Sequence, residues 1–267
     1  MNFFLDVDGT LLPFGSKSVP ESGVKAIREA RAEGHRVFFA TGRSRLEITE
    51  SLYSVGFDGG VFAAGASIIV NGKEVYHQVL PEEDKDFLLG YFAKEGMDLL
   101  VQSDNGTWVN RKALEHWDRL LVRYLGSSVA VDNLRLSEEL PPGTTVNKLL
   151  YMTDRGSIRE VRNALCPRFI VIPNTLGIPE DLMGEVSAAG ITKATGIQRV
   201  IDYLGEDLST VCAIGDGSND LEMIQFARIG VAMGNALPEV KAAADYIAPD
   251  VDDDGLAAAF RHVLGKD

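Results

Sequence analysis

Short apolar runs and longer amphipathic stretches alternate along the first third of the chain. Residues 2–7 are mostly apolar and run into a polar loop, which predicts a buried strand ending near residue 7. A helix is expected to end at about Glu33, because apolar residues recur at helical spacing before it and a glycine follows. Residues 35–40 and 60–64 are again apolar and predict two further buried strands.

Cap and turn signals refine these predicted elements. Ser18 and Glu21 have the spacing of a capping box, which predicts that the first helix begins there. Ser44 is expected to cap a second helix that runs to about residue 55. Asn71 and Gly72 stand between two apolar runs, and this dipeptide favours the tight primed turn of a β-hairpin.

The same alternation returns near the end of the chain. The pattern predicts helices at 192–204, 219–227 and from residue 255 onward, and strands at 210–214, 229–233 and 246–248. Strands that are separated by helices are typical of a parallel sheet covered on both faces. The outer thirds of the sequence therefore predict an α/β fold with a doubly wound parallel sheet.

The middle of the chain has a different texture. Helices are predicted at 82–94, 112–125 and 157–165, and strands at 99–102, 108–109, 146–152 and 169–172. This mixture does not follow the strict alternation of the outer thirds. We therefore predict a core domain formed by residues 1–81 and 188–267, with an α+β domain inserted at 82–187.

Composition and charge narrow the function classes. The 267 residues include 26 basic and 39 acidic side chains, a net charge of −13, and this balance argues against a nucleic-acid partner. The longest apolar stretch, residues 61–70, is too short to span a bilayer, and the first residues do not resemble a signal peptide. Two cysteines, Cys166 and Cys212, provide neither a metal motif nor a disulfide framework. We expect a cytoplasmic protein without a membrane partner.

Polar side chains follow three of the predicted strands. They are Asp6 and Asp8 after the first strand, Thr41 after the second, and Asp216, Asn219 and Asp220 after the strand at 210–214. In a parallel sheet the carboxyl ends of the strands share one edge, so these side chains are expected to meet there. Carboxylates together with a substrate phosphate suit Mg²⁺, and Lys193 at a helix start would add a positive charge.

Five segments carry a resemblance to a known family. They are residues 6–10 (Asp-Val-Asp-Gly-Thr), 40–43 (Ala-Thr-Gly-Arg), Lys193, 214–220 (Ile-Gly-Asp-Gly-Ser-Asn-Asp) and 230–236 (Gly-Val-Ala-Met-Gly-Asn-Ala). The chain resembles the haloacid dehalogenase superfamily and, within it, the Cof-like sugar-phosphate phosphatases. The resemblance implies a Rossmann-like core, an inserted cap of type IIB and magnesium-dependent hydrolysis of small phosphate monoesters.

The resemblance also assigns catalytic and metal-binding roles by position. Asp6 is similar to the nucleophile that forms an aspartyl-phosphate, and Asp8 to the general acid and base. Asp6, the backbone carbonyl of Asp8, and Asp216 are similar to the metal ligands. Asp220 is similar to a residue that orients the lysine or the waters of the metal.

Phosphate contacts follow from the same resemblance, with one departure from the family pattern. Thr41, Gly42, Lys193 and Asn219 are similar to the residues that contact the substrate phosphate. Many relatives carry Asn-Gly-Ala after the third strand, whereas Ala64 stands here in place of the asparagine. A polar side chain that could contact the substrate is therefore missing.

Two other functions fit parts of the pattern. A hexose phosphomutase of the phosphomannomutase kind would share the aspartate pair and a similar cap. A phospho-acceptor signalling module would also combine acids, Thr41 and Lys193, but the size of the insertion and the position of Asp8 argue against it. Arg43 is expected to form an ion pair rather than contact phosphate. The sequence makes no prediction about the individual substrate or the oligomeric state.

Overall fold

The structure is a computed structural model that describes residues 1–126, 134–174 and 176–266. Its contacts divide the chain into two compact units. The first, here called the core unit, comprises Met1–Arg43, Ile48–His77 and Thr192–Asp267. The second, the cap unit, comprises Ser44–Glu47 and Gln78–Ile191. The sequence did not lead us to expect the first of these two cap segments. The domain boundaries at 81/82 and 187/188 stay a prediction.

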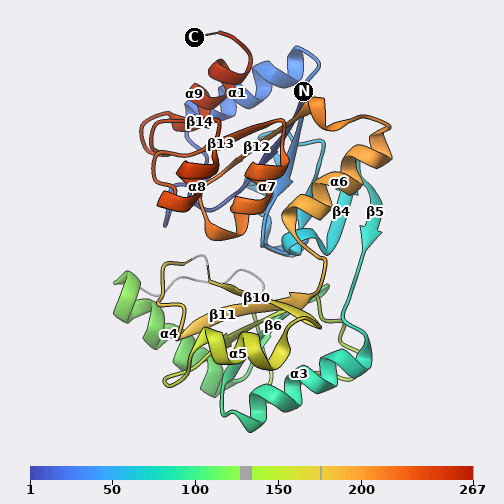
Figure 1. The fold of residues 1–267 in the computed structure, drawn as a ribbon, viewed down its shortest axis with the longest axis vertical. Helices are drawn as coiled ribbons and strands as arrows, with labels where there is room; N and C mark the ends of the chain where they lie inside the picture. The colour runs from blue at the N-terminus through green and yellow to red at the C-terminus, as the bar shows by residue number, and fades with distance from the viewer. Residues whose placement is uncertain (127–133, 175, 267) are drawn as a thin grey trace. The chain divides into compact units, whose positions relative to one another are not determined.

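The core unit contains an eight-stranded sheet in the order β14-β13-β12-β1-β2-β3-β4-β5 (Figure 1). Its strands are β1 (Asn2–Leu5), β2 (Arg36–Ala40), β3 (Gly59–Phe62), β4 (Ser67–Val70), β5 (Lys73–His77), β12 (Val211–Gly215), β13 (Ile229–Ala232) and β14 (Tyr246–Ile247). The strands from β14 to β3 are parallel, and β4 and β5 add an antiparallel edge. The chain leaves β1 toward β2 and returns on its other side at β12. The switch point of this doubly wound sheet therefore lies between β1 and β12.

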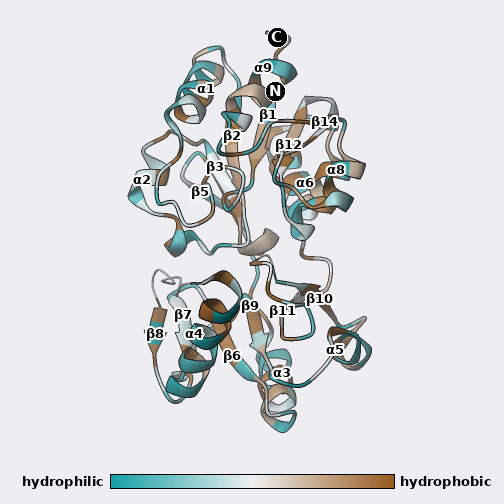
Figure 2. Ribbon diagram, turned by 90° about the vertical axis from the view of Figure 1, so that its left-hand side faces the viewer, coloured by the Kyte–Doolittle hydropathy of each residue, from teal (hydrophilic) through white to brown (hydrophobic). Residues whose placement is uncertain are grey.

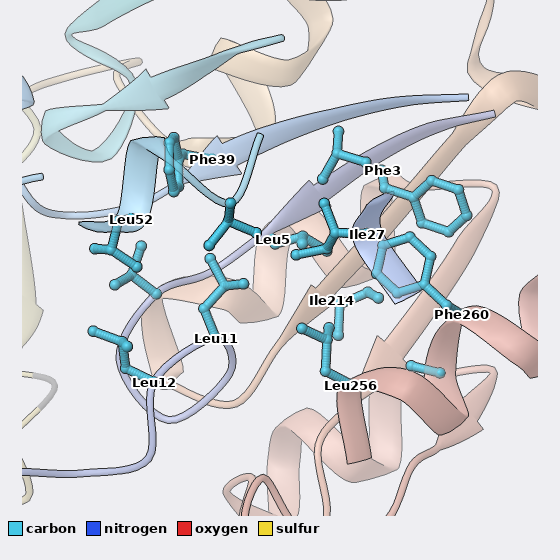
Figure 3. Packing of buried hydrophobic residues seen from close by; sticks show 14 of the residues in the cluster. Phe3, Leu5, Leu11, Leu12, Ile27, Phe39, Leu52, Ile214, Leu256 and Phe260 are labelled. Carbon is cyan, nitrogen blue, oxygen red and sulfur yellow. The ribbon is translucent and has the colours of Figure 1, made fainter. Parts of the chain in front are cut away.

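Helices cover both faces of the core sheet, as predicted. The helices α1 (Glu21–Ala32), α2 (Glu50–Tyr53) and α9 (Gly255–Val263) pack on one face, and α6 (Lys193–Leu204), α7 (Leu221–Phe226) and α8 (Pro238–Ala243) on the other. Side chains of β1 alternate between the faces: Phe3 stacks on Phe260 of α9 with ring centroids 4.4 Å apart (Figure 3). Phe4, on the other face, stacks on Phe38. In Figure 2 the strands β1 and β2 appear in brown tones, consistent with their burial.

The cap unit contains a six-stranded sheet in the order β10-β11-β9-β6-β7-β8. Its strands are β6 (Asp98–Ser103), β7 (Gly106–Val109), β8 (Leu134–Leu136), β9 (Lys148–Met152), β10 (Phe169–Pro173) and β11 (Met183–Ala188). Its helices are α3 (Glu82–Lys94), α4 (Arg111–Leu125) and α5 (Ile158–Leu165). All neighbouring strands are antiparallel except β7 and β8. The predicted α+β fold of the inserted domain is thus confirmed.

The two faces of the cap sheet bury different residues. Leu149 and Tyr151 of β9 pack with α3 and α5, whereas Met152 packs with α4. On the α4 face, Lys148 lies directly opposite Gln102 of β6. Part of this face is therefore polar although it is buried.

Two helix starts differ from the sequence prediction. Ser18 does not cap α1, because the helix begins after Pro20 and no side chain caps it. The Ser18 carbonyl instead accepts a hydrogen bond from the Ser16 hydroxyl in the preceding loop. The capping-box spacing was therefore misleading, because the backbone of Ser18 forms its hydrogen bonds with Ser16 inside the loop.

The helix predicted after Ser44 is largely absent. The chain forms a 3-10 turn at Arg45–Glu47 and only a short α2. The buried Glu47 carboxylate accepts hydrogen bonds from the Ser44 amide and from the side chains of Gln102 and Thr107. Contacts within the cap unit thus replace the helical pattern in this segment.

Among the predicted strands, the structure confirms one hairpin, shortens one strand and adds two that were not predicted. The hairpin of β4 and β5 is confirmed, with Asn71 at φ 50° and Gly72 at φ 77° as a primed turn requires. The third strand ends earlier than predicted, because Ala63 and Ala64 adopt φ 48° and 55°. The strands β8 and β11 were missed, since Met183–Ala188 lacks a regular apolar alternation.

Among the described residues, no helix is long and apolar enough to cross a bilayer.

Candidate active site

Two aspartates lie at the switch point of the core sheet. Asp6 and Asp216 are the residues that directly follow β1 and β12, which pair in parallel. The Asp6 amide donates to the carbonyl of Ile214 at 3.0 Å, which continues the ladder to this point. Carboxylate oxygens of Asp6, Asp216 and Asp220 all lie within 4.8 Å of one another. The predicted convergence of these three acids is observed in the geometry.

Lys193 lies among these acids. Its Nζ donates to Asp6 Oδ1 and to Asp220 Oδ1, each at 2.6 Å. The other oxygen of Asp220 accepts the amides of Asp216 at 3.0 Å and Gly217 at 2.9 Å. Protein donors therefore occupy both oxygens of Asp220. In the described part of the chain, Oδ2 of Asp6 and of Asp216 accepts no recorded hydrogen bond, so both can bind a ligand.

Close packing of α6 brings Lys193 to the site. Thr192 is the N-cap of the helix and forms a capping box with Thr195, so Lys193 is the first helical residue. A Cβ at Gly65 would lie 2.3 Å from the carbonyl oxygen of Thr192, and one at Gly196 would lie 2.4 Å from a β3 side chain. These two glycines therefore allow the start of α6 to approach the ends of the strands.

The loop after β1 touches Asp216 directly. Thr10 Oγ1 donates to Asp216 Oδ1 at 2.8 Å. Gly9 has φ 85°, and a Cβ there would lie 2.3 Å from Asp216 Oδ2. Both the conformation and the close approach require glycine at this position. The Asp216 carboxylate is thus held from one side by a hydroxyl and confined on the other by the backbone.

Asp8 forms a two-point ion pair with Arg43. Arg43 Nε donates to Asp8 Oδ2 at 2.9 Å, and Nη2 donates to Oδ1 at 2.5 Å. The Asp8 side chain remains 43% exposed, so it is accessible to solvent. The expectation that Arg43 forms an ion pair is therefore met, with a partner that the sequence did not suggest.

The predicted phosphate contacts lie around this pair and the lysine. Thr41 is buried at the end of β2, and its Oγ1 accepts the amide of Arg43 at 3.1 Å. Gly42 is half-buried between them. Asn219 is half-buried in the 3-10 turn Ser218–Asp220, next to Asp220. Their contact with a phosphate stays a prediction.

The negative charge of the aspartate cluster is not balanced by the positive charge of Lys193. Burial and then the charge of Asp220 raise the pKa of Asp6 well above its ordinary value, although Lys193 opposes them. Burial, followed by the charge of Asp220, also raises the pKa of Asp216 to about 7. Burial alone would lower the pKa of Lys193, but the charges of Asp220 and Asp6 outweigh it and raise that pKa. Negative charge thus exceeds the positive charge that Lys193 supplies.

A divalent cation fits this site. The donor set consists of carboxylate oxygens, which hard cations prefer, and Asp6 and Asp216 each have an oxygen available. A cation would also offset the charge that raises the pKa values of these two acids. The residues of this chain are therefore compatible with a divalent metal.

Three contacts of the site were not predicted from the sequence. Thr10 bonds to Asp216, Arg43 bonds to Asp8, and the side chain of Asn235 bonds to the backbone of Gly9. Thr10, Arg43 and Asn235 all stand inside the quoted motifs. Their membership in these motifs was the only available signal, because a sequence does not show which polar atoms meet.

Comparisons with known proteins agree on the family. Residues 3–260 match the family of haloacid dehalogenase-like hydrolases. The Bacillus subtilis protein YkrA is 32% identical over 260 residues, which cover 97% of this chain and 96% of the relative. The 5-amino-6-(5-phospho-D-ribitylamino)uracil phosphatase YcsE of Bacillus subtilis is 29% identical and covers 97% of this chain and 93% of its own length.

Solved structures show the same fold. The structure of the subclass IIB sugar phosphatase BT4131 is similar with a TM-score of 0.79 and 26% identity, covering 98% of each chain. That of the phosphatase BT1666 from Bacteroides thetaiotaomicron has a TM-score of 0.81 and 28% identity, covering 98% of this chain and 94% of the other. The chain therefore belongs to the haloacid dehalogenase-like hydrolases and is a Cof-like phosphatase.

Proposed function

We propose that this phosphatase hydrolyses small sugar or polyol phosphates with Mg²⁺, through a phosphoryl group carried on Asp6. The observation that carries the proposal is the charge balance around Asp6. This acid and Asp216 lie at the switch point with raised pKa values, and among the described residues Lys193 is the one cation hydrogen-bonded to Asp6. Such an arrangement suits a cation and a substrate phosphate that arrive together.

In the first step, a carboxylate oxygen of Asp6 attacks the phosphorus, and the bond from phosphorus to the ester oxygen breaks. Protonated Asp8 gives its proton to the leaving oxygen, so the product departs as an alcohol. Lys193, already bonded to Asp6 Oδ1, offsets negative charge as the two anions approach. Asp6, Asp216 and the Asp8 carbonyl would hold Mg²⁺, which would supply further charge stabilisation to the phosphoryl group.

In the second step, ionised Asp8 removes a proton from water while the water oxygen attacks the phosphorus of the aspartyl-phosphate. The bond between phosphorus and Asp6 breaks, which releases phosphate and restores the Asp6 carboxylate. Asp8 is left protonated for the next turnover. Two hydrogen bonds from Arg43 hold the Asp8 carboxyl group in a defined orientation for this step.

Two relatives support the substrate class. One is named as a sugar phosphatase, and another as a phosphatase of a ribitylamino-uracil phosphate. A phosphate on a polyhydroxylated carbon chain is common to both names. We therefore propose that class for this chain, with Thr41, Gly42 and Asn219 among the phosphate contacts and Asp220 holding Lys193 in place.

The proposal is tested by phosphate release from a panel of sugar and polyol phosphates, with Mg²⁺ and with chelator. We expect release only with Mg²⁺, and a loss of at least about 10⁴-fold in the Asp6→Asn variant. Asp86→Asn, on the exposed surface of α3, is the matched control and should retain full activity. Conversion of a hexose phosphate to its isomer without phosphate release would instead identify a mutase and overturn the proposal.

A further inference from the structure

The side chain of Asn235 joins loops that follow three different strands of the core sheet. Asn235 stands between β13 and α8 and is half-buried. Its Nδ2 donates to the carbonyl oxygen of Gly9 at 2.8 Å, in the loop after β1. Its Oδ1 accepts the amide of Val251 at 3.1 Å, in the loop after β14. The amide group is thus used at both ends.

The Gly9 carbonyl belongs to a peptide group that controls Asp216. Gly9 lies so close to Asp216 that a Cβ would be 2.3 Å from Oδ2, and the next residue, Thr10, donates to Oδ1 at 2.8 Å. Rotation of the peptide between Gly9 and Thr10 would move both of these contacts. A hydrogen bond that fixes the Gly9 carbonyl therefore also limits the orientation of the Asp216 carboxylate.

The loop that carries Asn235 is itself fixed. The Gly234 amide donates to the carbonyl of Pro249 at 2.9 Å, and a Cβ at Gly234 would lie 2.4 Å from the amide of Asp250. The amide of Leu237 donates to the backbone carbonyl of Asp216 at 3.0 Å. One loop thus reaches the backbone of Asp216 directly and its carboxylate through Gly9 and Thr10.

We propose that Asn235 is a positioning residue that orients Asp216 for the divalent cation, acting through the peptide between Gly9 and Thr10. The inference rests on the proposed function, because it concerns the metal of that site. An amide is needed, since it donates to Gly9 and accepts from Val251. A carboxylate at this position can only accept, and would face the Gly9 carbonyl with a second acceptor.

Metal binding without substrate tests this role. Mn²⁺ is titrated into metal-free full-length protein, and the free ion is followed by electron paramagnetic resonance, with Mg²⁺ as competitor. We expect Asn235→Asp to weaken Mn²⁺ binding about 10-fold or more, as loss of a group that orients a ligand typically does. The added negative charge would by itself strengthen cation binding, so weaker binding cannot arise from charge. Asn105→Asp, on an exposed turn of the cap unit, is the charge control and should leave binding within about twofold.

A second pair of variants keeps the test independent of the folding of Asn235→Asp. Thr10→Val removes the hydroxyl that holds Asp216 Oδ1, and Asn235→Ala removes the bridge without adding charge. If both residues act on the same carboxylate, the double variant loses less than the product of the two single losses. Independent effects, or unchanged Mn²⁺ binding in folded Asn235→Asp, would overturn the inference and leave the proposed function intact. Absence of metal binding in the unaltered protein would overturn both.

Discussion

The core unit and the cap unit both bury charged side chains, but they balance them differently. In the cap, Lys148 and Glu185 pair at 2.5 Å with side chains only 5% and 8% exposed. One buried cation there meets one buried anion. In the core, Lys193 alone bonds to two buried acids, and Asp216 lies beside them. The core cluster therefore carries negative charge that its own lysine does not neutralise.

Two aspartates show the same contrast. Burial alone would raise the pKa of Asp98 in the cap, but hydrogen bonds from Lys112 and His116 outweigh it and hold that pKa below its ordinary value. Burial and the charge of Asp220 raise the pKa of Asp216 in the core, and Lys193 only partly compensates. Proteins usually pair the charges that they bury for structural reasons. A buried group left short of its counter-charge therefore indicates a ligand site.

Of the changes that test this difference between core and cap, removal of Lys193 should have the largest effect. Lys193→Met removes the side-chain cation that bonds to Asp6 and offsets the approach of substrate phosphate. We expect kcat to fall about 10²–10³-fold at saturating Mg²⁺, the range for loss of one charge-stabilising group. Lys25→Met removes an exposed lysine of the same unit and should change kcat little. A kcat within twofold of the unaltered enzyme in Lys193→Met would contradict the role of this lysine.

Removal of Lys148 in the cap should lower the free energy of unfolding, and a second substitution should restore it. Lys148→Met leaves Glu185 buried without a partner, and we expect the free energy of unfolding to fall by about 3–5 kcal/mol. The double variant Lys148→Met/Glu185→Leu should recover most of that loss, because an apolar pair needs no counter-charge. Urea unfolding of the cap and the core in all three proteins measures this. No recovery in the double variant would contradict the view that Lys148 serves to pair Glu185.

The pH dependence of stability should reveal the uncompensated acid. The pKa of Asp216 is about 7 in the folded protein, above its value in the unfolded chain. Between about pH 4 and pH 7 the folded state therefore holds a proton that the unfolded state has released. In chelator, this group should make the free energy of unfolding decrease as the pH rises through that range, by about 4 kcal/mol.

Asp216→Asn and Mg²⁺ provide the controls for this pH effect. The asparagine variant does not titrate, so its stability should decrease less between about pH 4 and pH 7. At pH 8, Mg²⁺ should raise the midpoint of thermal unfolding of the unaltered protein and leave that of Asp216→Asn nearly unchanged. Equal pH profiles for the two proteins in chelator would contradict the pKa assigned to Asp216.

The smallest expected effect concerns Ala64, which stands where many relatives carry asparagine. Ala64 has φ 55°, a left-handed conformation that costs an alanine more than a glycine. Ala64→Gly should raise the free energy of unfolding by about 0.5–1 kcal/mol, after allowing for the greater entropy of glycine in the unfolded chain. Ala258→Gly in α9 should instead lower it by about 1 kcal/mol, because that residue is helical. A loss of stability in Ala64→Gly would show that the strain is absent.

Sequence patterns predicted the core fold better than the details of the site. The ends of β1 and β12 could be read from apolar runs followed by acids, because parallel strands end at one edge of the sheet. The pairing of Asp8 with Arg43 could not be predicted in the same way, because it depends on side-chain geometry. The sequence identified both residues but gave no contact between them.

Elements whose structure depends on distant contacts were predicted least well. Ser44 was expected to cap a helix, but Glu47 bonds to residues of the cap sheet and a 3-10 turn forms instead. Local propensity cannot show such a contact, because its partners are far away in the sequence. For the same reason β11 was missed: its pairing with β9 and β10 compensates for a weak local pattern.

The central claim, that Asp6 carries the phosphoryl group, is tested most directly by trapping that group. Asp8→Asn is mixed with p-nitrophenyl phosphate and Mg²⁺, since this leaving group needs no proton and only the second step should be slowed. The quenched protein is then reduced with borohydride, which converts an acyl phosphate to an alcohol, and digested for mass spectrometry. We predict one equivalent of p-nitrophenol in a burst and homoserine at position 6. A burst with unmodified Asp6, or with the modification at another residue, would contradict the account.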